Sequence, residues 1–174
     1  MKLKIWGWDK KPRTMLRYIK PGDIFCFELK EETFALNLNR KVYGFGRIMT
    51  KMSLGHSAEI FDFFSTTPEL KNDFELDCSR LMPPLILDSY SLFDRKIIGD
   101  WRIIGRQEDY LHSGDEDVYF LWGSKGLEKK TSLYGESSEA TEEEVKKYPY
   151  KIAWDDLFIT KMIPDDAIEK IRML

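Results

Sequence analysis

The sequence predicts an α+β protein: a mainly antiparallel, strongly curved, half-barrel-like β-sheet with two or three short helices. Three features support this fold class. Runs in which apolar and polar residues alternate, a pattern typical of strands, lie between residues 23 and 64. Aromatic residues, which favour strands, make up 14% of the 174 residues. Signals for helix starts stand at Thr67-Pro68, at Thr141 and at Pro164.

A short strand is expected close to the N-terminus. Between Lys2 and Trp8, Leu3 and Ile5 alternate with lysines, and Trp6 is expected to share a face with Trp8. Tryptophans beside basic residues can stack on nucleic-acid bases, although such residues more often close one end of a core.

Strand-like runs follow a turn at Pro21-Gly22, where proline presets φ and glycine accepts a positive φ. The runs cover residues 23–29, 34–38, 42–49 and 58–64. The first three are separated by short polar breaks, so we expect them to form a meander. The fourth is apolar on both faces, which predicts a mostly buried strand.

The same runs predict the core. Phe25 and Phe27 share one face of the first run, and we expect both to be buried together with Phe61 of the fourth. Gly44 and Gly46 share a face of the third run. Because glycine weakens a strand, this pair predicts a close approach of another group to the backbone or a strong bend.

The remaining elements are expected to be short. The expected strands or extended segments are residues 85–88, 92–93, 99–105, 118–123 as a central strand, and part of 152–159. The expected helices are a turn or two after Thr67, a surface helix from the Thr141–Glu144 capping box to Pro149, and a C-terminal helix from Pro164.

One domain spanning residues 1–174 is expected, because no Pro/Gly/Ser-rich linker interrupts the chain. The N-terminal residues are too charged for a signal peptide, and no apolar run approaches the length of a membrane span. We therefore expect a cytoplasmic protein in which Cys26 and Cys78 stay reduced and form no disulfide.

The sequence shows no convincing catalytic or metal site, and no cofactor is expected. His56 and Glu59 have an HxxE spacing, but they straddle a strand start and further metal ligands are missing. Cys26 is expected to be a small core residue rather than a nucleophile. The loop with Asp115 and Asp117 lacks the glycine and the distant glutamate of a calcium loop. An enzyme with an unmarked carboxylate site stays open as an alternative.

Three short motifs carry a resemblance to a known family. KPGDIFCFEL from residue 20, YGFGRI from residue 43 and AEIFDFFS from residue 58 together resemble the immunity protein 26 family of bacterial polymorphic-toxin and contact-dependent growth inhibition systems. The matching residues are Pro21, Gly22, Asp23, Phe25, Gly46 and Phe61, and the resemblance ends around Gly123. It implies a non-enzymatic cytoplasmic protein that binds and neutralises a cognate toxin domain, as a heterodimer.

Charge is distributed unevenly along the chain. Residues 1–22 hold seven Lys/Arg and one Asp, whereas residues 108–144 hold eleven Asp/Glu and three Lys. Because a nuclease toxin needs a basic surface to attract phosphate, clustered carboxylates can imitate its substrate. The residues expected to bind the toxin are Asp115, Glu116, Asp117, Glu142, Glu143 and Glu144. The alternative reading is a nucleic-acid-binding domain that uses the basic segment from Lys2 to Lys20 with its two tryptophans.

Overall fold

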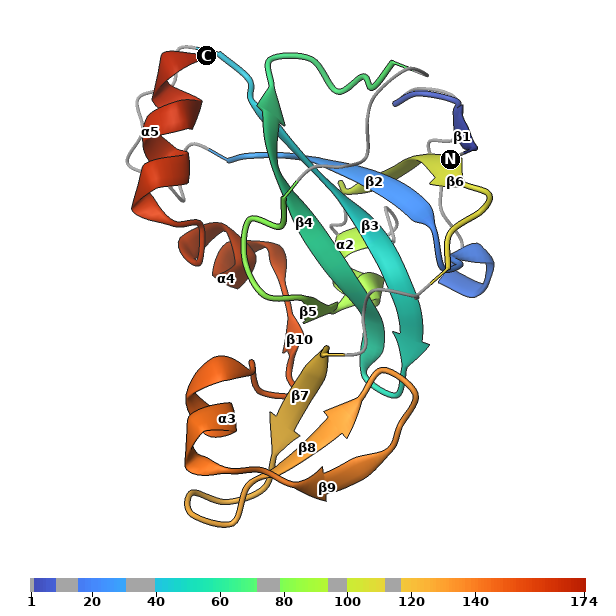
Figure 1. Cartoon of the computed structure of the whole chain (residues 1–174). Coiled ribbons are helices and arrows are strands. Elements are labelled where there is room, and N and C mark those ends of the chain that lie inside the picture. Colours follow the sequence, from blue (N-terminus) through green and yellow to red (C-terminus); the bar gives the residue numbers. More distant parts are fainter. Residues whose placement is uncertain (1, 9–15, 31–39, 72–78, 94–99, 112–116) are drawn as a thin grey trace.

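The computed structural model describes residues 2–8, 16–30, 40–71, 79–93, 100–111 and 117–174 (Figure 1). Within these ranges the chain forms a seven-stranded sheet, a three-stranded sheet and four α-helices, so the α+β class is confirmed. The strands of the large sheet are β1 (Leu3–Ile5), β2 (Asp23–Glu28), β3 (Tyr43–Met52), β4 (Gly55–Ser65), β5 (Leu85–Leu87), β6 (Arg102–Gln107) and β10 (Ala153–Trp154). The small sheet contains β7 (Tyr119–Trp122), β8 (Lys129–Ser132) and β9 (Ser137–Glu139). The helices are α2 (Ser89–Phe93), α3 (Glu142–Lys147), α4 (Asp156–Lys161) and α5 (Asp165–Met173), with a 3₁₀ turn η1 at Leu16–Tyr18.

The large sheet is mainly antiparallel, as expected. Its order is β1-β6-β2-β3-β4-β5-β10, and only the β5–β10 pair at one edge is parallel. Because the order begins at β1 and ends at β10, the sheet is open rather than closed into a barrel. The half-barrel-like curvature stays a prediction.

The two strand glycines make room for aromatic rings. Gly44 and Gly46 of β3 lie opposite Phe27 and Phe25 of β2. A Cβ atom at either glycine would overlap the ring of its partner. The predicted close approach is therefore confirmed, and it lets both rings stack on Trp101, with centroids 4.2 Å (Phe27) and 5.3 Å (Phe25) away.

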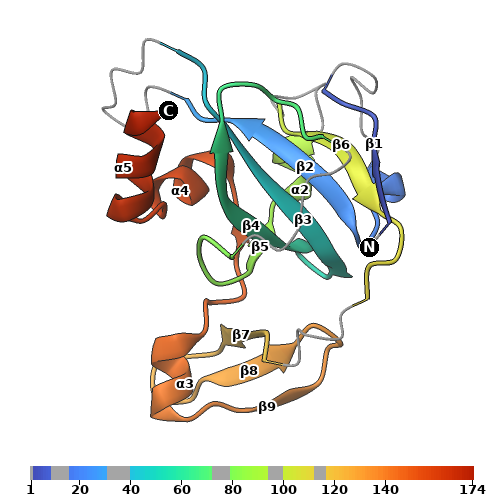
Figure 2. The ribbon, with the colours of Figure 1, turned by 45° about the horizontal axis from the view of Figure 1, so that its top comes forward.

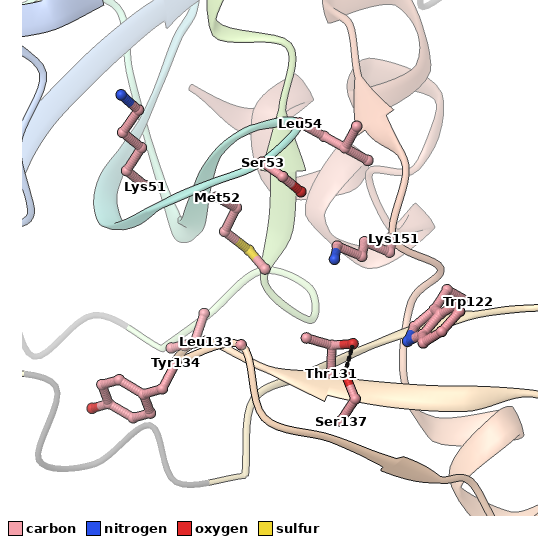
Figure 3. A pocket seen from close by; sticks show the side chains of 11 residues that line it. Lys51, Met52, Ser53, Leu54, Trp122, Thr131, Leu133, Tyr134, Ser137 and Lys151 are labelled. Carbon is pink, nitrogen blue, oxygen red and sulfur yellow. Dashed lines mark hydrogen bonds between the residues drawn. The ribbon is translucent and has the colours of Figure 1, made fainter.

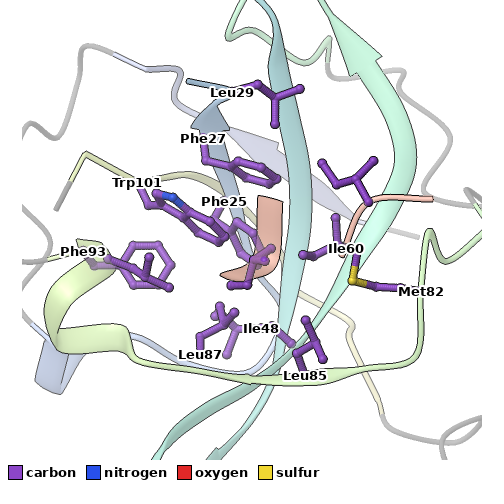
Figure 4. Packing of buried hydrophobic residues seen from close by; sticks show 14 of the residues in the cluster. Phe25, Phe27, Leu29, Ile48, Ile60, Met82, Leu85, Leu87, Phe93 and Trp101 are labelled. Carbon is purple, nitrogen blue, oxygen red and sulfur yellow. The ribbon is translucent and has the colours of Figure 1, made fainter. Parts of the chain in front are cut away.

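Both faces of β2 are buried. Phe25 and Phe27 belong to the main core cluster, which Phe93 and Trp101 join and which α2, α4 and α5 help to cover (Figure 4). Ile24 and Cys26 point to the other face, into a second cluster that includes Phe61. The expected burial of Phe25, Phe27 and Phe61 is thus confirmed.

The small sheet packs below the end of the large one (Figure 2). Phe120 of β7 and Leu133 after β8 are buried in one cluster with Met49 of β3 and Ile86 of β5. The residues 118–123 do form a strand, but β7 lies at the edge of the small sheet rather than at the centre of a sheet. Among the described residues, a bridge from Leu121 to Tyr150 covers part of its outer edge.

Several sequence predictions are corrected by the structure. Residues 92–93 end helix α2 instead of forming an extended segment, and the helix expected from Pro68 is absent from residues 68–71, which form a bend and coil. Segment 152–159 contains only the two-residue strand β10 before α4 begins. Trp6 packs against the main cluster and Trp8 against the second one, so they do not share a face. The strand ends at Ile5, and Gly7 between the tryptophans has a φ of +83°, which breaks the alternation.

Other predictions hold or fall outside the described residues. Helix α3 has the predicted capping box, and α5 begins after Pro164 with Ala167 and Ile171 buried. Leu174, which follows α5, is 42% exposed. The run 34–38 lies outside the described residues, and so does Cys78, which leaves the disulfide prediction untested.

Candidate functional site

The first turn of α3 carries the predicted acidic residues 142–144. Thr141 caps this helix: its hydroxyl accepts a hydrogen bond from the Glu144 N–H at 3.3 Å, and the Glu144 carboxylate accepts one from the Thr141 N–H at 3.0 Å. The cap fixes the direction in which the helix starts. Glu142 and Glu143 consequently point to solvent, and both are exposed.

Glu144 has a structural task. Its carboxylate pairs with the Lys130 ammonium group on β8, and this contact, with the hydrogen bond from Thr141, lowers the pKa of Glu144. The pair ties α3 to the small sheet, together with a contact between the rings of Tyr119 and Tyr148 at 5.3 Å. Glu144 therefore has less capacity to bind a partner than Glu142 or Glu143.

The second acidic cluster is only partly described. Asp115 and Glu116 lie outside the described residues. Asp117 is exposed and lines a hollow of about 250 Å³ beside Lys147 and Tyr148, at the C-terminal end of α3. Since Glu142 and Glu143 occupy the first turn, the structure places Asp117 at the opposite end of this helix.

Sequence reasoning missed another exposed carboxylate near α3. Glu139 ends β9 and lies three residues before Glu142, and it is also exposed. Within the described part of the chain, neither Glu139, Glu142 nor Glu143 takes part in an ion pair. The charge run 136–144 was the available signal, but it does not reveal which carboxylates are already paired.

The HxxE pair is not a site. His56 Nδ1 lies 2.8 Å from the Ser89 hydroxyl, and burial lowers the pKa of His56 to about 4, with a further contribution from Lys51. Glu59 instead binds Arg47 and Arg80. Among the described residues, no group of three or more His, Cys, Asp or Glu is placed to hold a metal ion.

The remaining sequence candidates are engaged in the fold. Burial raises the pKa of the Cys26 thiol, which suits a core residue and disfavours the thiolate. The Trp6 indole donates a hydrogen bond to the carbonyl of Ile103 at 2.9 Å. The ring of Trp8 lies under the guanidinium of Arg102 at 4.1 Å. Both indoles are partly buried and pack against core clusters, which suits residues that close the core.

A comparison with protein-family models identifies the family of this chain. The family model of immunity protein 26 matches residues 20–133, about two thirds of the chain. The chain therefore belongs to the immunity protein 26 family, whose members neutralise a cognate toxin and are not enzymes. Searches of curated proteins and of solved structures gave no match. None of the described helices is long and apolar enough to span a bilayer.

The match extends further than the sequence motifs indicated. It ends at Leu133, beyond Gly123, and so includes β7 and β8. The elements β9, α3, β10, α4 and α5 follow the matched residues. Glu142 and Glu143 thus belong to the part of the chain that the family model does not cover.

Proposed function

We propose that this chain neutralises a nuclease toxin in the cytoplasm by forming a heterodimer with it through the acidic surface, defined as residues 115–117 and 142–144. The observation that carries the proposal is the pair of exposed carboxylates Glu142 and Glu143, which form no ion pair within the described residues. A nuclease attracts nucleic acid with cationic side chains, and unpaired carboxylates meet the same charge requirement as phosphates. Membership of the immunity family supplies a toxin as the partner.

The proposal assigns unequal weights within the acidic surface. For Glu142 and Glu143 the free-energy cost of binding a toxin cation is small, because neither side chain has to release an internal partner. Glu144 already holds Lys130, so a toxin cation would have to compete for it. Exposed charges at the rim of an interface act mainly on the association rate, which falls as salt screens them.

Binding kinetics test this proposal. Glu142→Lys/Glu143→Lys should slow association with an inactive variant of the toxin domain encoded by the adjacent upstream gene by about tenfold at low salt, and by less at high salt. Glu69→Lys/Glu169→Lys is the matched control, since it makes the same change in charge at two exposed glutamates outside the acidic surface. The active toxin should cleave nucleic acid, and added wild-type chain should stop it. An association rate within twofold of the control rejects the acidic surface, and a toxin without nuclease activity rejects the nuclease assignment.

A further inference from the structure

An open groove lies between the β3–β4 turn and the face of the small sheet that packs on the large one (Figure 3). Its volume is about 610 Å³, and its lining includes Met52, Leu54, Trp122 and Tyr134. The groove is separate from the acidic surface. Thr131 and Ser137 of β8 and β9 line it, whereas α3 contacts the opposite face of this sheet through Tyr119 and Lys130.

The groove continues the contact between the two sheets. Phe120 on β7 is buried against the large sheet, and so is Leu133. Trp122 lies two residues further along β7 on the same face, and it is 42% exposed. Leu54 opposite it is 49% exposed, and Tyr134 is 70% exposed. Apolar surface therefore extends past the point where the sheets meet, and the described residues leave it open.

The groove is also cationic. Lys151 extends toward it from the segment that leads to β10, and Lys51 of β3 lies at its rim with the ammonium group turned away from Lys151 (Figure 3). The lining contains no carboxylate among the described residues. The ammonium group of Lys129 lies 5.5 Å from the centroid of the Trp122 ring. No ion pair joins these three lysines to the described residues, although Glu139 lies opposite Lys129 across the β8–β9 pair. Most of this positive charge is therefore available to a partner.

We propose that this groove is a second docking site for the toxin and that it takes an acidic segment carrying at least one apolar side chain. The inference rests on the proposed function, because the segment belongs to the toxin. Unpaired lysines favour an anionic partner, while Met52 and Leu54 favour an apolar side chain. Trp122 is of the residue type that most often anchors an interface. Single-stranded nucleic acid binds by stacking its bases on aromatic side chains, and it would gain nothing from the aliphatic residues Met52 and Leu54.

The two surfaces together define a docking orientation. Negative charge lies at the start of α3, and the lysine-lined groove opens on the other face of the same sheet. A toxin that engages both must present a basic region to the helix and an acidic segment to the groove. The reversed orientation would bring like charges together, so the arrangement selects one pose and one class of cognate partner.

The groove is tested with the full chain and the inactive toxin domain from the adjacent upstream gene. Lys51→Glu/Lys151→Glu should weaken binding by about tenfold or more at low salt, because both charges then repel the acidic segment. Trp122→Ala should cost at least about tenfold at all salt concentrations, because the loss is apolar. The control is Lys71→Glu/Lys125→Glu, which reverses two exposed lysines outside the groove. Thermal melting checks folding, and Lys51→Gln/Lys151→Gln replaces the charge-reversal variant if that one unfolds.

The outcomes separate this inference from the proposed function. If both groove variants stay within twofold of the control while Glu142→Lys/Glu143→Lys weakens binding, the groove is not a toxin site and the acidic surface stands. If only the groove variants weaken binding, the groove is a docking site and the acidic surface is wrong. A wild-type chain that does not bind the toxin overturns both. The last measurement is a titration with a single-stranded RNA oligomer at the same salt concentration. If Lys51→Glu/Lys151→Glu abolishes RNA binding but leaves toxin binding unchanged, the groove binds nucleic acid, and the assignment of a toxin segment as its occupant is overturned.

Discussion

Phe27 fits beneath β3 because its partner in the sheet has no side chain. Its ring is fully buried, lies against Gly44 and stacks on Trp101. Phe27→Ala should lower the free energy of unfolding by roughly 3–5 kcal/mol, because it leaves a cavity beside an aromatic stack. The control is Tyr90→Ala, whose ring is 56% exposed, with urea denaturation as the measurement.

The same pair allows a coupling test. Gly44→Ala alone should destabilise the protein by about 1–3 kcal/mol, because the new methyl group overlaps the Phe27 ring. In a Phe27→Ala background the methyl group has room, so Gly44→Ala should cost clearly less. Additive effects of the two substitutions would show that the ring and the glycine do not contact each other.

His56 gives stability a dependence on pH. Burial lowers its pKa from 6.5 to about 4, so the folded protein binds this proton only at a lower pH than the unfolded chain does. The contribution of His56 is therefore complete above pH 6.5 and is lost as the pH falls toward 4. A difference of this size amounts to roughly 3 kcal/mol at most.

Urea denaturation at about pH 7 and about pH 4.5 measures this loss. His56→Gln keeps a polar side chain that cannot titrate, and the other charged groups, including Lys51, are common to both proteins. The variant should lose less stability on acidification than the wild type. An equal loss in both would assign the acid sensitivity to other groups.

Helix α3 is the element that presents the acidic surface, and it has only six residues. A helix of this length is only marginally stable in isolation. Its caps and its contacts with the small sheet therefore stabilise it. Thr141→Ala should lower the free energy of unfolding by about 1 kcal/mol and speed amide exchange in α3. Thr66→Ala, at an exposed bend outside any helix, is the control. Unchanged exchange in α3 would show that the capping box is dispensable.

The elements that were predicted correctly carry local signals. The capping box at Thr141 and the alternation from residue 23 to 28 are complete in the sequence, and both elements form as expected. Helix α4 was missed because its apolar residues are of types that favour strands, while Asp155 caps it by accepting a hydrogen bond from the Phe158 N–H at 3.1 Å. A capping aspartate was the signal that could have identified this helix.

At the scale of the whole molecule, the sequence alone could predict that the acidic residues lie side by side, but it could not predict which residues line the groove. Glu142 and Glu143 are neighbours in the chain, and a helix start exposes them together. The groove instead joins Lys51, Trp122 and Lys151, which are far apart in sequence. Their proximity depends on how the small sheet packs below the large one, and no periodicity within a single element reports such packing.

The C-terminal segment is part of the core, although the family match stops at Leu133. Strand β10 pairs with β5 at the edge of the large sheet, and α4, α5 and the turn between them add buried side chains to the main cluster. Ile159, Ile163 and Ile171 are among them, each at most 5% exposed. Burying three such side chains contributes about 5–9 kcal/mol, which is comparable to the whole stability of a typical domain.

A chain that ends at Leu133 should therefore lose its cooperative unfolding transition, even though it contains all of the matched residues. Circular dichroism during thermal melting measures this transition. Removal of Met173 and Leu174 alone is the control, and it should leave the melting temperature nearly unchanged because both side chains are exposed. If residues 1–133 instead melt cooperatively near the temperature of the full chain, the segment that follows is an appendage, and the three isoleucines contribute little to holding the sheet together.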